Sequence, residues 1–173
     1  MGVPSGYTSA QVVQAVPVPK GIVQVVSTTK TDTFTASTST YTDITGLSVS
    51  ITPTSASNKI FVLAFVQGSQ DVGVDPATLQ LVRGSTAIAV GDTAGSRIVG
   101  TSQLSSGPDA SVMGSNSFAF LDSPATTSAT TYKIQGKSNQ AANAFFVNRT
   151  DNDTNSTVHS RTVSTITVME VIV

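Results

Sequence analysis

The chain has 173 residues, no cysteine, and a net charge of −1 from nine basic and ten acidic residues. A chain of this length is expected to form one domain, whose core is held by packing rather than by disulfides or thiolate-bound metal. Its near-neutral charge, without a Lys/Arg cluster, gives no attraction to nucleic acid or anionic lipid. We therefore expect neither nucleic acid nor a membrane as a partner.

The first twenty residues differ from the rest and are predicted to form a separate N-terminal arm, residues 1–20. Thr8 and Gln11 have the spacing of a capping box, and prolines at 17 and 19 end any helix that starts there. So short a helix is unstable alone and has to dock on another surface. The residues predicted to anchor the arm to a larger particle are Tyr7, Val12, Val13 and Val16. The alternative is a frayed tail.

The stretch from Ser27 to Asp43, STTKTDTFTASTSTYTD, resembles a disordered spacer in composition. Disorder usually accompanies high net charge and low hydrophobicity, whereas this chain is 39% hydrophobic and only 11% charged. Threonine is β-branched and suits the half-exposed surface of a strand. We interpret the stretch as an edge and connecting segment whose Phe34 and Tyr41 point inward.

Strand patterns are frequent from Gly21 onward and predict an all-β domain over residues 21–173. Alternation in TYTDITGLSVSITP ends at Pro53, and KIFVLAFVQ is apolar on both faces, as in a strand covered on both sides. Shorter candidates are TLQLVRG, TAIAVG, SRIVG, SFAFLD, TYKIQG and AFFVN. Short strands at regular spacing, without a convincing interior helix, predict a jelly-roll-like antiparallel β-sandwich. The phenylalanines of these strands are assigned to the core: Phe61, Phe65, Phe118, Phe120, Phe145 and Phe146.

The last strand, VSTITVMEVIV, is the segment most informative about assembly. Apolar residues occupy both of its faces although it ends the chain. A central strand of a monomer could show this pattern, but we favour a strand that also lines a subunit interface, formed by Val168, Met169, Val171 and Ile172. Glu170, the only glutamate, lies within this run; if it is buried, it needs a partner such as Arg161 or a position near an exit to solvent.

Motifs for catalysis or metal binding are weak. His159 is the only histidine, and no G-x-S-x-G pattern surrounds any serine, so we predict no enzyme and no cofactor. The GKS at residues 136–138 lacks the preceding glycine of a phosphate-binding loop. The run DNDTN from Asp151 to Asn155 has alternating oxygen ligands but lacks the glycine and the closing glutamate of an EF-hand. A loose calcium site and a plain polar loop both remain open there.

Several stretches in the same order resemble a widespread domain of structural proteins of tailed bacteriophages. They are IVQVVSTTKTDTFTASTSTYTDITGLSVSITPTSASNKI, LVRGSTAIAVGDTAGSR, FLDSPATTSATTYKIQGKS, FFVNRTDND and STITVMEV, and together they span most of residues 21–173. Such domains are usually described as tail-fibre or virion structural proteins and look like the jelly roll of the C1q and tumour-necrosis-factor type. The resemblance implies a homotrimer with its terminal strands near the threefold axis.

The function expected from this resemblance is that of a virion structural protein. We favour a homotrimeric capsid decoration or cement protein, assembled in the host cytoplasm, whose arm binds the major capsid protein or another virion protein. The alternative is the receptor-binding knob of a short tail fibre or head fibre. Its loops, such as Gly100 to Ser115 or Asn148 to His159, would contact a host surface glycan. A polysaccharide-degrading enzyme is a poor third candidate, because such enzymes need paired carboxylates and this chain has a single glutamate.

Overall fold

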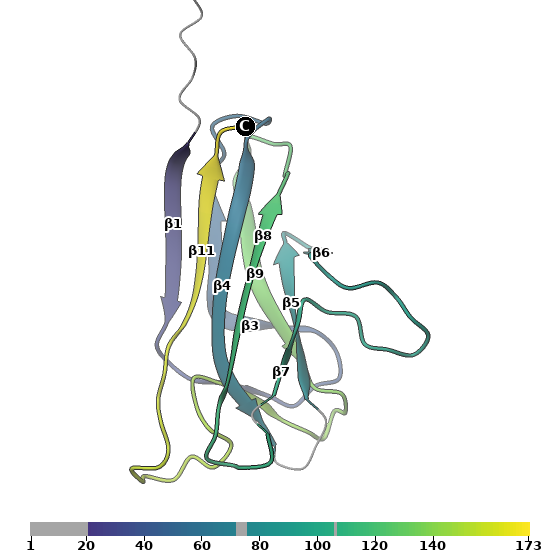
Figure 1. The fold of residues 1–173 in the computed structure, drawn as a ribbon, viewed down its shortest axis with the longest axis vertical. Helices are drawn as coiled ribbons and strands as arrows, with labels where there is room; N and C mark the ends of the chain where they lie inside the picture. The colour runs from purple at the N-terminus through teal and green to yellow at the C-terminus, as the bar shows by residue number, and fades with distance from the viewer. Residues whose placement is uncertain (1–20, 72–75, 106) are drawn as a thin grey trace, which may run out of the picture.

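The protein folds into an antiparallel β-sandwich of two packed sheets (Figure 1). The structure, a computed structural model, describes residues 21–71, 76–105 and 107–173. The predicted arm, with Tyr7, Val12, Val13 and Val16, lies outside the described residues. Within them there is no helix, and the strands are β1 (Ile22–Lys30), β2 (Phe34–Ala36), β3 (Thr42–Ile51), β4 (Lys59–Gln70), β5 (Ala77–Arg83), β6 (Thr86–Ile88), β7 (Ser102–Leu104), β8 (Gly114–Asp122), β9 (Thr130–Lys137), β10 (Phe145–Val147) and β11 (Ser164–Val171).

The strand order is that of a jelly-roll-like sandwich. In the first sheet β11 lies between β1 and β4, and β8 pairs with the other side of β4. The short strands β10 and β2 extend this sheet beyond the end of β11. In the second sheet β9 lies between β3 and β5, and both β6 and β7 pair with β5. The all-β, jelly-roll-like prediction is therefore confirmed.

The core lies between the two sheets, and in the long strands β4, β9 and β11 it is built mainly by alternation of buried and outward-facing residues. In β11 the buried positions are Ser164, Ile166, Val168 and Glu170, and the intervening residues face outward. The largest group of core side chains comes from β3, β4, β5, β9, β10 and β11: Ile44, Leu47, Val49, Ile51, Ile60, Val62, Ala64, Val66, Leu79, Leu81, Tyr132, Ile134, Phe145, Val147, Ile166 and Val168. Phe34 of β2 packs against Phe145 with ring centroids 5.8 Å apart, as its inward assignment requires.

A buried polar contact joins the sheets at one end of the sandwich. The Tyr132 hydroxyl, from the second sheet, donates a 2.6 Å hydrogen bond to Asp122 Oδ2 of the first. Arg83 Nη1 donates to both oxygens of the same carboxylate, at 2.7 and 2.8 Å. Burial and the bond to Asp122 raise the pKa of Tyr132 well above its usual value. The hydroxyl therefore stays protonated and keeps Asp122 paired.

Two sequence-based assignments need correction. Residues 96–100, predicted as a strand, form part of a loop that is closed by a hydrogen bond from Gly91 N to Gly100 O, and the strand β7 begins after them. Figure 1 shows this segment between β6 and β7 projecting from the sandwich. Phe61 and Phe65 are also not in the core, because their positions in β4 alternate with the buried ones and point to the outer face of the first sheet.

Candidate subunit interface

The outer face of the first sheet carries a row of apolar side chains across all four main strands. Val25, Met169, Phe61 and Leu121 are directly opposite one another in β1, β11, β4 and β8. Val25 is 56% exposed and Leu121 is 46% exposed. Leu63, Phe65 and Val171 adjoin this row along β4 and β11. We call these seven residues the apolar face.

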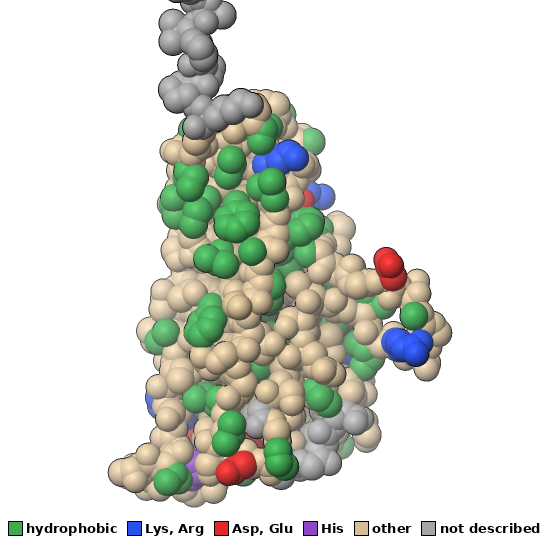
Figure 2. Space-filling model, viewed as in Figure 1, with side chains coloured by type: hydrophobic (Ala, Val, Ile, Leu, Met, Phe, Trp, Pro, Cys, Tyr) green, Lys and Arg blue, Asp and Glu red, His purple; other side chains and the backbone are tan. Residues whose placement is uncertain are grey.

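Most of the apolar face lies toward one end of the sheet. Figure 2 shows hydrophobic side chains gathered over the upper half of β1, β11, β4 and β8, next to the end where the described chain begins. Hydroxyl side chains of β1 and β11 flank the rest of the face, because Ser27 and Thr167 lie in the row of Leu63, and Thr29 and Thr165 in the row of Phe65. Lys59, opposite Val171, is the charged residue at the margin. Contiguous exposed apolar surface of this kind is typical of protein–protein contacts.

The residues predicted to line a trimer interface divide between the two faces of β11. Met169 and Val171 belong to the apolar face and are half-buried in the subunit. Val168 points the opposite way, is 0% exposed and belongs to the core, so no second subunit can touch it. Including Val168 was wrong, because side chains alternate along a strand and only one set can face outward. Ile172 follows the strand, and its backbone N–H donates to Gly21 O at 3.0 Å, beside the start of β1.

Most of the apolar face was not assigned to an interface from the sequence. The sequence pattern predicts core positions for Phe61 and Phe65 and indicates no interface role for Val25, Leu63 or Leu121. The sequence of β4 does indicate an interface. KIFVLAFVQ is apolar on both faces, but the opposite sheet of a sandwich covers only one of them, so the other face needs a different partner. The alignment of Leu121 and Val25 with Phe61 depends on the register between paired strands, which the sequence pattern does not reveal.

Glu170 lies at the core-facing side of β11 and is 0% exposed. Its Oε1 accepts hydrogen bonds from Thr54 N (2.7 Å), Thr54 Oγ1 (2.8 Å) and Asn58 Nδ2 (2.7 Å), and its Oε2 accepts one from Gln24 Nε2 (2.5 Å). Burial alone would raise the pKa of Glu170, but the hydrogen bonds from Gln24, Asn58 and Thr54 outweigh it and lower the pKa to about 2. The carboxylate thereby ties β1 and the β3–β4 connection to the last strand.

The predicted partner of Glu170 was wrong, because Arg161 lies in the loop before β11 and pairs with Asp153. That bond lowers the pKa of Asp153, and Arg149 Nη1 lies 3.8 Å from the same carboxylate. A cation bound by the run from Asp151 to Asn155 would have to compete with both guanidinium groups. This arrangement favours a polar loop over a calcium site.

His159 serves as a connection between loops. Its Nδ1 donates to the Thr154 carbonyl oxygen at 3.0 Å, and its Nε2 lies 3.3 Å from Ser111 Oγ. Over residues 21–71, 76–105 and 107–173 no group of three or more His, Asp or Glu side chains is arranged to hold a metal ion. In the same ranges no helix is long and apolar enough to span a membrane.

No model of a known protein family matches this chain, and a search of curated proteins finds no match.

Proposed function

We propose that the protein is a structural component of a bacteriophage virion, a homotrimer that decorates the capsid and is anchored through residues 1–20. The observation that carries the proposal is the apolar face, which crosses β1, β11, β4 and β8 on the outer side of the first sheet. The resemblance of five sequence stretches to phage structural domains supports the virion setting and the threefold symmetry. The protein would act by binding rather than by catalysis.

A second copy of this chain is the occupant that suits the apolar face. The face has Lys59 at its margin and no charged side chain among its seven members, so two or three copies can meet there without burying like charges. It extends over both edge strands, β1 and β8, so neighbours around an axis can contact it from either side. Burying Leu63, Phe65 and Leu121, which are 36% to 46% exposed in the subunit, favours association.

The position of residue 21 links the apolar face to the proposed anchor. Gly21 lies beside Ile172 at the end of the sheet where the apolar face is located. In a trimer assembled through that face, the three chains would enter their first strands at the same end. Three tethers on one body raise the effective concentration of each arm at neighbouring sites to about the millimolar range. Binding to the particle would then be far tighter than one arm provides.

The arm can be tested by comparing three proteins for binding to purified particles that lack the decoration. These are the complete chain, a chain that starts at Gly21, and a control in which residues 2–20 are replaced by a Gly/Ser linker of equal length. The proposal predicts that only the complete chain cosediments with the particles, while all three have the same far-UV circular dichroism. Full occupancy by the chain that starts at Gly21 would contradict the anchoring role.

A receptor-binding knob is the second candidate, and a specific feature favours it. The segment between β6 and β7 projects from the sandwich with exposed Arg97 and Ile98, as a recognition loop would. Copy number separates the two candidates, since a decoration protein is present in tens to hundreds of copies per particle and a fibre in far fewer. Quantitative mass spectrometry of purified particles against the major capsid protein makes this distinction.

A further inference from the structure

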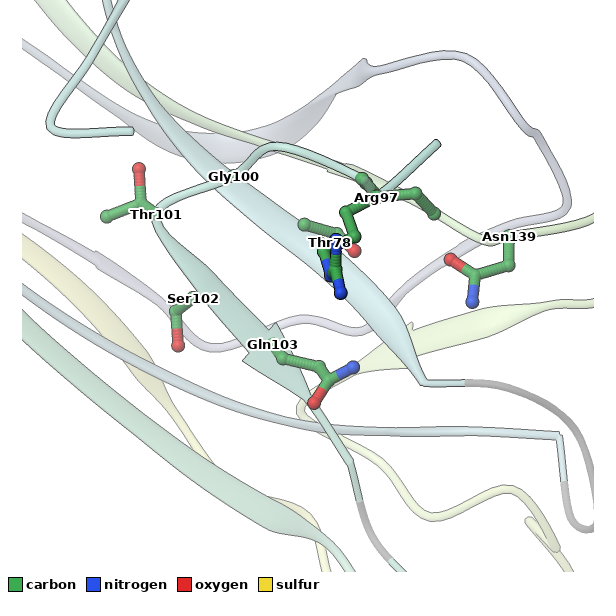
Figure 3. Close-up of a pocket in the computed structure, with 8 residues that line it drawn as sticks. Thr78, Arg97, Gly100, Thr101, Ser102, Gln103 and Asn139 are labelled. Carbon is green, nitrogen blue, oxygen red and sulfur yellow. The ribbon is translucent and has the colours of Figure 1, made fainter. Parts of the chain in front are cut away.

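A pocket of about 400 Å³ opens at the base of the projecting segment, on the second sheet. Figure 3 shows its walls: Arg97 from the segment, Gly100 to Gln103 leading into β7, Thr78 of β5, and Asn139 just after β9. Thr78 faces away from the core, because its neighbours Ala77 and Leu79 are core residues. The pocket is therefore on the side of the sandwich opposite the apolar face. Its volume is at the small end of the range for ligand sites.

The walls of this pocket offer hydrogen-bonding groups that the fold leaves unused. Arg97 is its only charged lining residue, and its guanidinium makes one hydrogen bond among the described residues, from Nη1 to the Ala94 carbonyl oxygen. In that same part of the chain, the side-chain amides of Gln103 and Asn139 make none. A guanidinium has five N–H donors in a planar fork that matches a carboxylate.

The oxygen of Asn139 is the most informative atom of the site. Among the described residues, two buried side-chain polar atoms lack a hydrogen-bond partner, and they are Ser138 Oγ and Asn139 Oδ1, neighbours in sequence. A buried acceptor without a donor is costly and rare in native proteins. Asn139 lines the pocket, but Oδ1 itself is closed to solvent, so a ligand hydroxyl could accept from the Asn139 amide or donate to Oδ1 only after a rotation of this side chain toward the pocket.

The pocket is formed before any ligand arrives. The Tyr41 hydroxyl donates to the Val99 carbonyl oxygen at 2.5 Å, and Thr101 N donates to Leu79 O at 2.8 Å, so the chain on both sides of Gly100 is fixed. A side chain at Gly100 would place its Cβ 2.3 Å from Thr78 Cγ2 and 2.9 Å from the Tyr41 hydroxyl. Glycine therefore permits the close approach that shapes the wall. The Lys137 ammonium, 5.4 Å from the centre of the Tyr41 ring, adds positive charge on the strand next to Thr78.

We propose that this pocket binds a sugar residue that carries a carboxylate, such as a hexuronic acid unit of an acidic polysaccharide. The carboxylate pairs with Arg97, ring hydroxyls exchange hydrogen bonds with the amides of Gln103 and Asn139, and Ile98 contacts the C–H face of the ring. A neutral sugar leaves the guanidinium without its anion. An inorganic anion leaves the two amides without hydroxyl groups. The site lies within one subunit, so its test does not depend on trimer formation.

The binding test uses the complete chain, titrated by calorimetry and followed by NMR of its backbone and side-chain amides. The probes are a short oligogalacturonate, the same oligomer with its carboxyl groups reduced to alcohols, and sodium phosphate. We expect saturable binding of the oligogalacturonate with shifts at Thr101 and at the Asn139 side-chain amide. Reduction of the carboxyl groups should weaken binding about tenfold or more, as the loss of a charged hydrogen bond does. Phosphate should not shift the Asn139 amide.

Substitutions assign the binding to this pocket. Arg97→Gln should weaken oligogalacturonate binding about tenfold and leave the reduced oligomer unaffected. Asn139→Ala should weaken both. Arg161→Gln is the matched control, because Arg161 is also exposed but lies in the loop before β11. The proposal is overturned if the oligogalacturonate does not bind, if the reduced oligomer binds as tightly as the oligogalacturonate, if phosphate reproduces the oligogalacturonate shifts, or if Arg97→Gln has no more effect than Arg161→Gln.

Discussion

Replacing Glu170 with glutamine tests how the fold secures its last strand. The carboxylate is fully buried and accepts hydrogen bonds from Gln24, Thr54 and Asn58, which lower its pKa from 4.5 to about 2. A pKa that is lower in the folded state stabilises the fold above pH 4.5, and this contribution is lost as the pH falls through about 2. The shift corresponds to an upper limit of about 3 kcal/mol at neutral pH. Glu170→Gln keeps the shape, removes the charge and turns one acceptor into a donor that faces other donors.

Urea unfolding at fixed protein concentration measures this effect, since unfolding of an oligomer depends on concentration. We expect Glu170→Gln to lower the free energy of unfolding by about 2–3 kcal/mol at pH 7, with the gap to the wild type shrinking between pH 4.5 and pH 2. Asp43→Asn is the control: Lys133 and Gln135 also hydrogen-bond Asp43, but its side chain is 55% exposed, so little change is expected. Equal stability of Glu170→Gln and wild type at pH 7, or a gap independent of pH, would refute the reasoning.

Leu63→Glu places a charge in the apolar face. About half of the leucine is already covered in the subunit, so the lost burial is about 1 kcal/mol per subunit, and each unpaired buried charge costs several kcal/mol more. We expect sedimentation velocity to show that Leu63→Glu is a folded monomer. The control Ser48→Glu, on the outer face of the second sheet, should leave the oligomer intact. A Leu63→Glu oligomer of unchanged mass would count against the interface. Tyr132→Phe removes the hydroxyl that pairs with buried Asp122 and should cost about 1–2 kcal/mol in urea unfolding, and an unchanged midpoint would show that this bond contributes nothing.

The fold class could be predicted from the sequence because local patterns determine it. Alternation in β3 and the doubly apolar pattern of β4 mark strands whatever their neighbours are. The strand predicted at residues 96–100, which the structure shows as a loop, marks the limit of this reasoning. Ile98 and Val99 favour a strand locally, but β5 is already paired with β6 and β7 on that edge, so the segment has no partner and projects as a loop.

The sites were harder to predict because they depend on residues far apart in the chain. The partners of Glu170 come from Gln24, Thr54 and Asn58, and nothing near position 170 indicates them. The pocket likewise joins Thr78, Arg97 and Asn139, which have no pattern in common. The predicted interface contained Met169 and Val171 of the apolar face, but the register that adds Val25, Phe61 and Leu121 follows only from the pairing of the strands.

The most direct test of the proposed assembly is the native mass of the purified chain over a range of concentrations. A single subunit has a mass of 17.7 kDa. If the apolar face is covered by copies of the same chain around a threefold axis, native mass spectrometry and light scattering will both give three times this value down to low micromolar concentration. A chain that remains at 17.7 kDa under all conditions would contradict the account.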